Sequence, residues 1–190
     1  MKLTRTTKIL LIASSLWYFG EGLFGPLFAI YAEKIGGNLL DITWAWALYL
    51  VSTGIFYVIV GKYVNQSKYK KHVMIFGYTL NACLTFGYMF IENANQLFML
   101  QVGLGIAEAL SAPIWDTLFA TNMESTENTF HWSLASGHTH FVSGIAIAIG
   151  GLIANYISFN ALFLTMGIIQ VIATLVQAKL LFDPTQKLEV

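Results

Sequence analysis

Two stretches of this sequence share one pattern of a glutamate, a proline and small residues. Residues 20–27 read Gly-Glu-Gly-Leu-Phe-Gly-Pro-Leu, and residues 107–114 read Ala-Glu-Ala-Leu-Ser-Ala-Pro-Ile. The matched pairs, 87 residues apart (from 21 to 108), are Glu21 with Glu108, Leu23 with Leu110, and Pro26 with Pro113. Because this offset is close to half of the 190-residue chain, the match predicts an internal duplication. The alternative is a chance likeness between two helices rich in small residues.

The composition is that of a membrane protein. Hydrophobic residues make up 56% of the chain and charged residues 11%, whereas about 25% of a typical soluble domain is charged. The apolar content excludes a disordered chain. A net charge of zero argues against a nucleic-acid partner, which would need a basic face. The single cysteine excludes a disulfide scaffold and a cysteine-based zinc site.

Six apolar segments are each long enough to cross a bilayer core of about 30 Å. They do not alternate with period two, which excludes the strands of a membrane β-barrel. We therefore predict an all-α integral membrane protein, a single domain over residues 1–190 with six transmembrane helices. The predicted spans cover residues 8–32, 42–64, 72–91, 96–120, 132–156 and 159–181.

The duplication divides these spans into two repeats, at about residues 8–91 and 96–182. Because three spans are an odd number, the second repeat enters the membrane from the opposite side, which makes a 3+3 inverted repeat. Pro26 and Pro113 each remove an internal hydrogen bond, so we predict a helix bend at both. The small residues beside them allow neighbouring backbones to approach closely.

The basic residues predict the orientation in the membrane. With the N-terminus in the cytoplasm, the inner segments hold nine of the ten Lys and Arg residues, and the outer loops hold only Lys34. This bias follows the positive-inside rule. Six spans return the chain to its starting side. We therefore predict a multi-pass protein of the cell (inner or plasma) membrane with both termini cytoplasmic.

Glu21 and Glu108 lie near the middle of their predicted spans. A charge at that depth costs at least a few kcal/mol, so both side chains are expected to face a bundle interior or a watery cavity. Low dielectric favours the protonated carboxyl, which is the chemistry of a proton-coupling site. Two alternatives are a counter-charge for a cationic substrate and a structural carboxyl bonded inside the bundle.

Helical spacing surrounds both glutamates with aromatic side chains and a few polar groups, as in a cavity for a small molecule. The central part of each span lacks Lys and Arg, which favours a cationic or neutral solute over an anionic one. The predicted proton-coupling and cavity residues are Glu21, Glu108, Trp17, Tyr18, Phe24, Phe28, Gln101, Ser111 and Trp115.

The histidines do not form a metal motif. His138 and His140 are two residues apart, which on a helix turns them about 200° from each other. Together with His131 they match no metal-ligand spacing that we recognise. The sequence has neither a phosphate-binding glycine loop nor a Ser/His/Asp arrangement. We therefore predict no metal, no cofactor and no enzymatic activity, and assign the three histidines no role.

A basic loop joins the second and third spans and reads Gly-Lys-Tyr-Val-Asn-Gln-Ser-Lys-Tyr-Lys over residues 61–70. Asp116 lies at a similar predicted depth, so it is either a gate that pairs with this loop or a solvated helix-end carboxylate. The chain resembles one half of a major facilitator superfamily transporter. In that family the signature between the second and third spans is Gly-x-x-x-Asp-Arg-x-Gly-Arg-Arg/Lys. Gly61 and Lys70 fit that signature, whereas Asn65 replaces the acid. The candidate gate is therefore Asp116, Gly61, Asn65 and Lys70.

The resemblance implies a secondary transporter, and residues 130–134, Phe-His-Trp-Ser-Leu, look like those of short, six-span members of the family. We therefore expect a half-size member rather than a truncated one. The leading hypothesis is a proton-coupled transporter of a small organic solute that works by alternating access as a parallel homodimer in the bilayer. The alternative is a non-transporting binding or assembly subunit, or a half-transporter that needs a different six-span partner.

Overall fold

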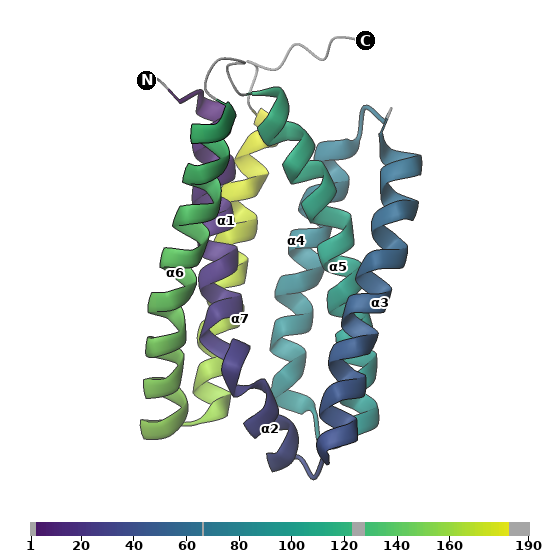
Figure 1. The fold of residues 1–190 in the computed structure, drawn as a ribbon, viewed down its shortest axis with the longest axis vertical. Coiled ribbons are helices and arrows are strands. Elements are labelled where there is room, and N and C mark those ends of the chain that lie inside the picture. The colour runs from purple at the N-terminus through teal and green to yellow at the C-terminus, as the bar shows by residue number, and fades with distance from the viewer. Residues whose placement is uncertain (1–2, 66, 123–127, 183–190) are drawn as a thin grey trace.

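The computed structural model describes residues 3–65, 67–122 and 128–182, and within these residues every regular secondary-structure element is a helix. Six long helices stand side by side as an elongated bundle, and a short helix, α2, lies at one end (Figure 1). The elements are α1 Arg5–Phe24, η1 Gly25–Leu27, α2 Phe28–Lys34, α3 Leu39–Val64, α4 Lys70–Gly87, η2 Tyr88–Phe90, α5 Ala94–Thr121, α6 Asn128–Tyr156, α7 Phe159–Ala178 and η4 Lys179–Phe182.

Five segments of the described chain are helices long and apolar enough to cross a membrane. They are Leu39–Val64, Lys70–Phe90, Ala94–Thr121, Thr129–Tyr156 and Phe159–Phe182. They coincide with the last five predicted spans. The first predicted span is not one continuous helix, because the 3-10 turn η1 divides it into α1 and α2. Pro26, in the middle of η1, has no backbone N–H to donate into a continuing α-helix.

Polar caps fix where the helices begin. The Asn38 side chain accepts from the backbone N–H of Leu40 and Asp41, and the Asp41 carboxylate accepts from the Asn38 N–H in return, which completes a capping box for α3. Asn93 caps α5 and Ser158 caps α7 in the simpler one-way form. The reversal between α2 and α3 uses Gly36 at a φ of 84°, a left-handed conformation that suits glycine.

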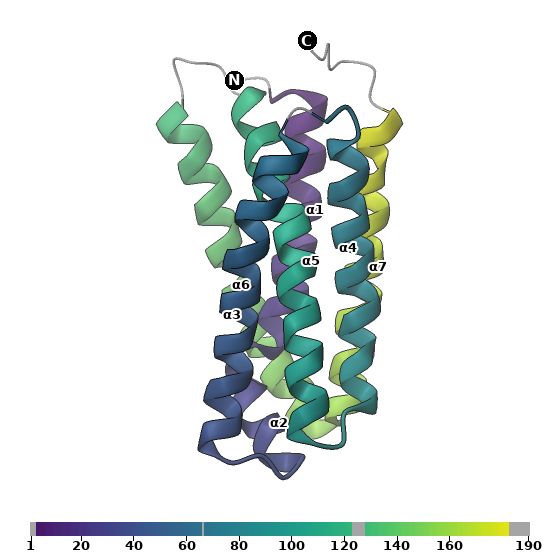
Figure 2. The same ribbon diagram turned by 90° about the vertical axis from the view of Figure 1, so that its right-hand side faces the viewer.

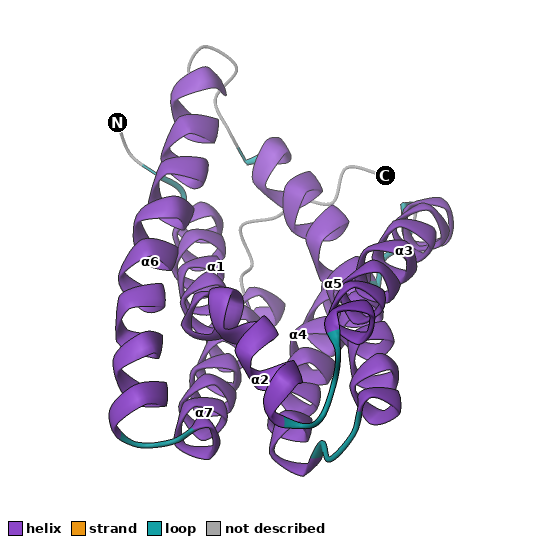
Figure 3. Ribbon diagram, turned by 60° about the horizontal axis from the view of Figure 1, so that its bottom comes forward, coloured by secondary structure: helices purple, strands orange, loops and turns teal. Residues whose placement is uncertain are grey.

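The helices pack as two groups of three. In one group α1 packs on α6 and α7, and in the other α5 packs on α3 and α4. The groups are joined where α4 packs on α7 (Figures 2 and 3). Small residues permit the closest approaches. A Cβ added to Gly22 would lie 2.9 Å from the Cβ of Ala146 on α6, and one added to Gly105 would lie 2.6 Å from the Tyr49 carbonyl oxygen on α3.

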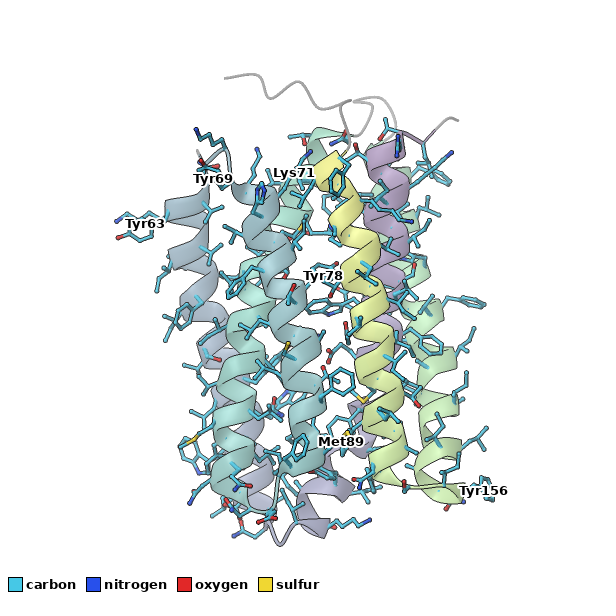
Figure 4. The ribbon with its side chains drawn as sticks, turned by 180° about the vertical axis from the view of Figure 1, so that it is seen from behind. Tyr63, Tyr69, Lys71, Tyr78, Met89 and Tyr156 are labelled. Carbon is cyan, nitrogen blue, oxygen red and sulfur yellow. The ribbon has the colours of Figure 1, made fainter. Side chains whose placement is uncertain are left out.

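The outer surface of the bundle is apolar. Among the five candidate spans, α3 and α6 are the least buried inside the structure. Tyr63 and Tyr156, which are 74% and 78% exposed, point away from the bundle, whereas Tyr78 points inward between α4 and α7 (Figure 4). An apolar outer face of this kind suits a lipid environment, in which no hydrophobic force expels such side chains.

Candidate functional site: a carboxyl-lined cavity

A cavity of about 600 Å³ lies between the two helix groups. Side chains from α1, α3, α4, α5 and α6 line it, together with Phe28 and Tyr88. Three carboxyls and one histidine are part of the lining, and no described lysine or arginine is. The structure brings all nine predicted cavity residues to the lining of this cavity: Glu21, Glu108, Trp17, Tyr18, Phe24, Phe28, Gln101, Ser111 and Trp115.

Glu21 joins three helices at the centre of the bundle. From α4, Asn81 Nδ2 donates to Glu21 Oε1 at 3.2 Å, and from α7, Gln170 Nε2 donates to the same oxygen at 3.1 Å. The residue nevertheless remains exposed, because it borders the cavity. Both recorded bonds go to one carboxyl oxygen, so the arrangement leaves Oε2 available to a proton or a solute.

Glu108 has a different kind of partner. The hydroxyl of Tyr49 on α3 donates to Glu108 Oε2. The Tyr49 ring lies 5.5 Å from the Trp46 ring, centroid to centroid, and both rings line the cavity. Each glutamate therefore ties its own helix to neighbours in the same group, and Glu21 also reaches across to α4.

Aromatic rings enclose the cavity toward α2. The Phe24 ring makes edge contacts with Tyr88 at 4.9 Å and with Phe163 at 5.1 Å. The Tyr31 hydroxyl donates to the Tyr88 carbonyl oxygen at 2.7 Å. Because Phe24 and Phe28 are 5% and 6% exposed, most of their surface packs in this cluster, and only a small part faces a solute.

Trp115 connects the two groups near the opposite end. Its indole Nε1 donates to the Leu10 carbonyl oxygen of α1 at 3.2 Å, and its ring stacks on Phe119 at 4.8 Å. Phe119 in turn contacts Trp132 of α6, edge to face, at 5.2 Å.

Gln101, which is 2% exposed, has a buried Nε2 without a hydrogen-bond partner in the described structure.

The cavity lining includes only one of the four candidate gate residues. Asp116 lines the cavity and is exposed, whereas Gly61, Asn65 and Lys70 lie outside its lining. Within the described residues no ion pair joins Asp116 to the basic loop, and Gln66 of that loop lies outside them. Lys71, which follows the loop, donates from Nζ to the Leu180 carbonyl oxygen of η4 at 3.1 Å. The gate therefore stays a prediction.

The two prolines of the repeat behave differently. Pro26 stands where α1 gives way to η1, and Pro113 lies inside α5, which continues as an α-helix on both sides of it. The neighbouring sequence accounts for part of this difference. Gly25 precedes Pro26, whereas Pro113 follows Ala112, and glycine weakens a helix by about 1 kcal/mol relative to alanine.

Sequence reasoning missed the partners of the two glutamates and the whole of one wall. Tyr49, Asn81 and Gln170 were not predicted, because hydrophobic periodicity does not show which helices are neighbours. The wall from α6 had a readable signal, since its polar residues recur at helical spacing. These lining residues are Ser136, Thr139, His140 and Ser143.

The two central histidines have separate surroundings. His140 lines the cavity, and its Nδ1 lies 2.7 Å from the Ser136 carbonyl oxygen. A carbonyl only accepts, so Nδ1 donates the hydrogen of this bond. His138 Nε2 lies 3.5 Å from the Ser14 hydroxyl of α1. In the described part of the chain, no group of three or more His, Cys, Asp or Glu residues is arranged to hold a metal.

Comparison of the sequence with known proteins identifies its family. The sequence model of the Major Facilitator Superfamily matches residues 10–190. The proton-coupled antiporter flippase LtaA of Staphylococcus saprophyticus is 25% identical over 69% of this chain and 34% of its own length. The uncharacterized MFS-type transporter MJ1560 of Methanocaldococcus jannaschii is 21% identical over 96% of this chain and 47% of its own length.

The chain thus spans less than half the length of those two relatives. It matches another, the uncharacterized MFS-type transporter YitZ of Bacillus subtilis, at 20% identity over 85% of this chain and 98% of that protein. The family match covers nearly all of the sequence, including every helix that contributes to the cavity. The chain belongs to the major facilitator superfamily.

Proposed function

We propose that this protein is a proton-coupled secondary active transporter of a small organic solute that is cationic or neutral rather than anionic. The observation that carries the proposal is the pair Glu21 and Glu108, which line one cavity of about 600 Å³. No described lysine or arginine in that lining offers a countercharge to an anion. Carboxyls kept in the middle of membrane helices are typical of proton and substrate pathways.

The helix packing supports a 3+3 inverted repeat with units at about 8–91 and 96–182. If α1 is exchanged with α5, α3 with α6 and α4 with α7, the contact of α1 with α6 becomes that of α5 with α3. The contact of α1 with α7 likewise becomes that of α5 with α4, and the contact between α4 and α7 maps onto itself. Such repeats are how many transporters build two access states.

Residues at the repeat positions agree with this exchange. A Cβ on Gly20 would meet Gln170 of α7, and the matching residue in the second repeat, Ala107, has its carbonyl oxygen beside Gly77 of α4. The start of α1 and the end of η4 lie at the same end of the bundle (Figure 1). Together with the basic loop between α3 and α4, this arrangement supports cytoplasmic termini.

We also propose that two parallel copies form one transport pathway. Both α3 and α6, the least buried of the candidate spans, contribute residues to the cavity lining. A second copy, related by an axis along the membrane normal, would supply the facing wall. LtaA, the relative named a proton-coupled antiporter flippase, supports the proton coupling, and the shorter YitZ supports a half-size transporter.

Transport by the purified protein in liposomes tests the proposal. A screen of organic amines, quaternary ammonium ions and neutral solutes for thermal stabilisation first identifies a ligand, since a ligand of the folded state raises its apparent stability. We expect the best stabiliser to accumulate in proteoliposomes under an imposed pH gradient and to leak out when a protonophore is added. Ligand binding without gradient-driven accumulation would instead favour a non-transporting subunit or a half that needs another partner.

A further inference from the structure

Gln170, at the centre of α7, is fully buried but only partly satisfied. Its exposed fraction is 0%. The side-chain Nε2 donates to Glu21 Oε1 at 3.1 Å and to the Trp17 carbonyl oxygen at 3.2 Å. The other amide atom, Oε1, is buried without a hydrogen-bond partner among the described residues. A buried acceptor without a donor is unfavourable, so a donor that reached this oxygen would stabilise it.

The backbone of α1 is shaped to receive this amide. A Cβ added to Gly20 would lie 2.7 Å from Gln170 Nε2 and 3.2 Å from Cδ. A larger residue at position 20 would therefore displace the Gln170 side chain from this position. The glycine thus leaves the amide group in direct contact with both Glu21 and the main chain of α1, at the point where the two helices meet.

We propose that Gln170 is a proton-dependent latch between α1 and α7 that responds to the protonation of Glu21 by turning its amide around. Ionised Glu21 can only accept, so it faces Nε2, as the structure shows. When Glu21 takes a proton on its free Oε2 from water in the cavity, the carboxyl rotates to place this new O–H donor toward Gln170, and the amide turns to present Oε1 to it. This inference rests on the proposed function, because it requires Glu21 to gain and lose a proton.

The turn changes how firmly α1 is held. In the ionised state one Nε2 group bridges the Glu21 carboxylate and the Trp17 carbonyl, and a bond to a charged acceptor is the stronger kind. In the protonated state the Trp17 carbonyl loses its donor and faces the amide oxygen instead. Protonation therefore weakens the attachment of α1 to α7, and such a differential effect is what shifts an equilibrium between two access states.

Other titratable groups line the same cavity, and the variants described below distinguish their titration from that of Glu21. Asn81, the α4 partner of Glu21, is neutral and stays a donor in both states. The remaining titratable residues of the cavity lining are Tyr18 on α1, Tyr49 on α3, Tyr78 on α4, Tyr88 on η2, Glu108 and Asp116 on α5, and His140 on α6.

Electron paramagnetic resonance between two spin labels measures the latch. The labels replace Ile30 on α2 and Ile168 on α7, which are 55% and 49% exposed, in a Cys83→Ser background. We expect the distance distribution to change between a pH well above and a pH well below neutrality. Glu21→Gln, whose amide can donate to Gln170 Oε1, should show the low-pH distribution at both values, and Glu108→Gln should keep the change.

Gln170→Met keeps the shape of the side chain but removes both amide atoms, so the pH-dependent change should be lost. The matched control is Gln177→Met. Gln177 is equally buried on α7 with an unpartnered Oε1, but its Nε2 donates to Met74 Sδ rather than to a carboxylate. It should respond like the parent protein. Gln170→Asn, whose amide is too short to bridge, is the second variant if Gln170→Met does not fold.

A change that persists in Gln170→Met and Gln170→Asn would overturn the latch, as would its absence from the parent protein or its loss in Glu108→Gln alone. Accumulation of solute by the unlabelled parent protein is measured in parallel. If the parent accumulates solute under a pH gradient while the latch variants still respond to pH, only the latch is wrong. If the parent shows no gradient-driven accumulation, the proposed function itself fails.

Discussion

Two glutamates with matching places in the sequence have chemically different partners in the structure. Glu21 accepts from the amides of Asn81 and Gln170, whereas Glu108 accepts from the hydroxyl of Tyr49. An amide nitrogen can only donate, but a phenol hydroxyl can both donate and accept. Tyr49 can therefore stay in place as a donor or an acceptor when Glu108 takes a proton, whereas the latch proposed for Glu21 requires the Gln170 amide to turn.

The Tyr49 hydroxyl can be removed without removing the ring. We expect Tyr49→Phe to lower the free energy of unfolding by about 1–3 kcal/mol, the usual range for a hydrogen bond to a charged group or for a buried group left unpaired. Thermal unfolding in detergent measures the change. The control is Tyr63→Phe on the same helix, because Tyr63 is 74% exposed and points outward. Equal stability of the two variants would show that the bond to Glu108 contributes nothing.

Substitution of Asp116 tests whether this residue is part of a gate or a solvated helix-end carboxylate. It lines the cavity and is exposed, so its charge is free to attract the basic loop in another access state. If it does, Asp116→Asn should bias the protein toward inward opening, and a cysteine introduced at Ser136 in the cavity should react faster with a cytoplasmic thiol reagent. Unchanged reactivity would identify Asp116 as a solvated helix-end carboxylate.

At the level of single residues, the sequence predicted which side chains line the cavity but not how they bond. Trp17, Glu21 and Ser111 could be placed because residues three and four apart share a helix face. The bond between Glu21 and Gln170 joins residues 149 positions apart, and no local pattern reports such a distance. The α6 wall, with Ser136 and His140, was readable from the same spacing rule and was overlooked.

At the level of the helices, the last five predicted spans coincide with five continuous helical segments. Length and apolar content sufficed because the bilayer thickness fixes both. The first span differs, since its Gly-Pro pair at 25–26 ends the α-helix in a 3-10 turn. Sequence alone predicted a bend there and at Pro113; α5 stays α-helical through Pro113, so the bend at that residue remains a prediction.

The contact between α1 and α6 depends on the absence of a side chain at Gly22. A Cβ there would lie 2.9 Å from the Ala146 Cβ and 3.1 Å from the main chain of Ser143. Gly22→Leu should therefore separate the helices and lower the free energy of unfolding by about 1–3 kcal/mol, as overpacking does. Gly144→Leu on α6 is the control, because a Cβ at Gly144 has nothing within 4 Å. Equal melting temperatures for the two variants would contradict this packing.

For the whole molecule, the cavity of a single copy is not closed on the side of α3 and α6 in the proposed arrangement. Both α3 and α6 contribute to the lining while remaining the least buried spans. Two copies inserted in the same direction would enclose the cavity and place two pairs of carboxyls around it, as proposed. This arrangement would also cover polar residues of α6, such as Ser136 and Thr139, that lipid would not solvate.

Crosslinking in native membranes tests the pairing. In a Cys83→Ser background, a cysteine at the cavity-lining Ser136 should give a dimer band with a bifunctional thiol reagent, because the two copies face one another there. A cysteine at Phe76 on α4, which is 59% exposed and outside the cavity lining, should give none. A strictly monomeric protein that still transports would contradict the homodimer.

The central claim is that the cavity carboxyls couple solute movement to protons. The measurement that tests it most directly compares two assays of the Glu21→Gln/Glu108→Gln double variant in liposomes, with the ligand found by the stabilisation screen. Amides keep the size and polarity of both side chains but cannot carry a transported proton. We predict that exchange of labelled for unlabelled solute without a gradient persists, while accumulation driven by a pH gradient is lost. Accumulation equal to that of the unmodified protein would contradict the account.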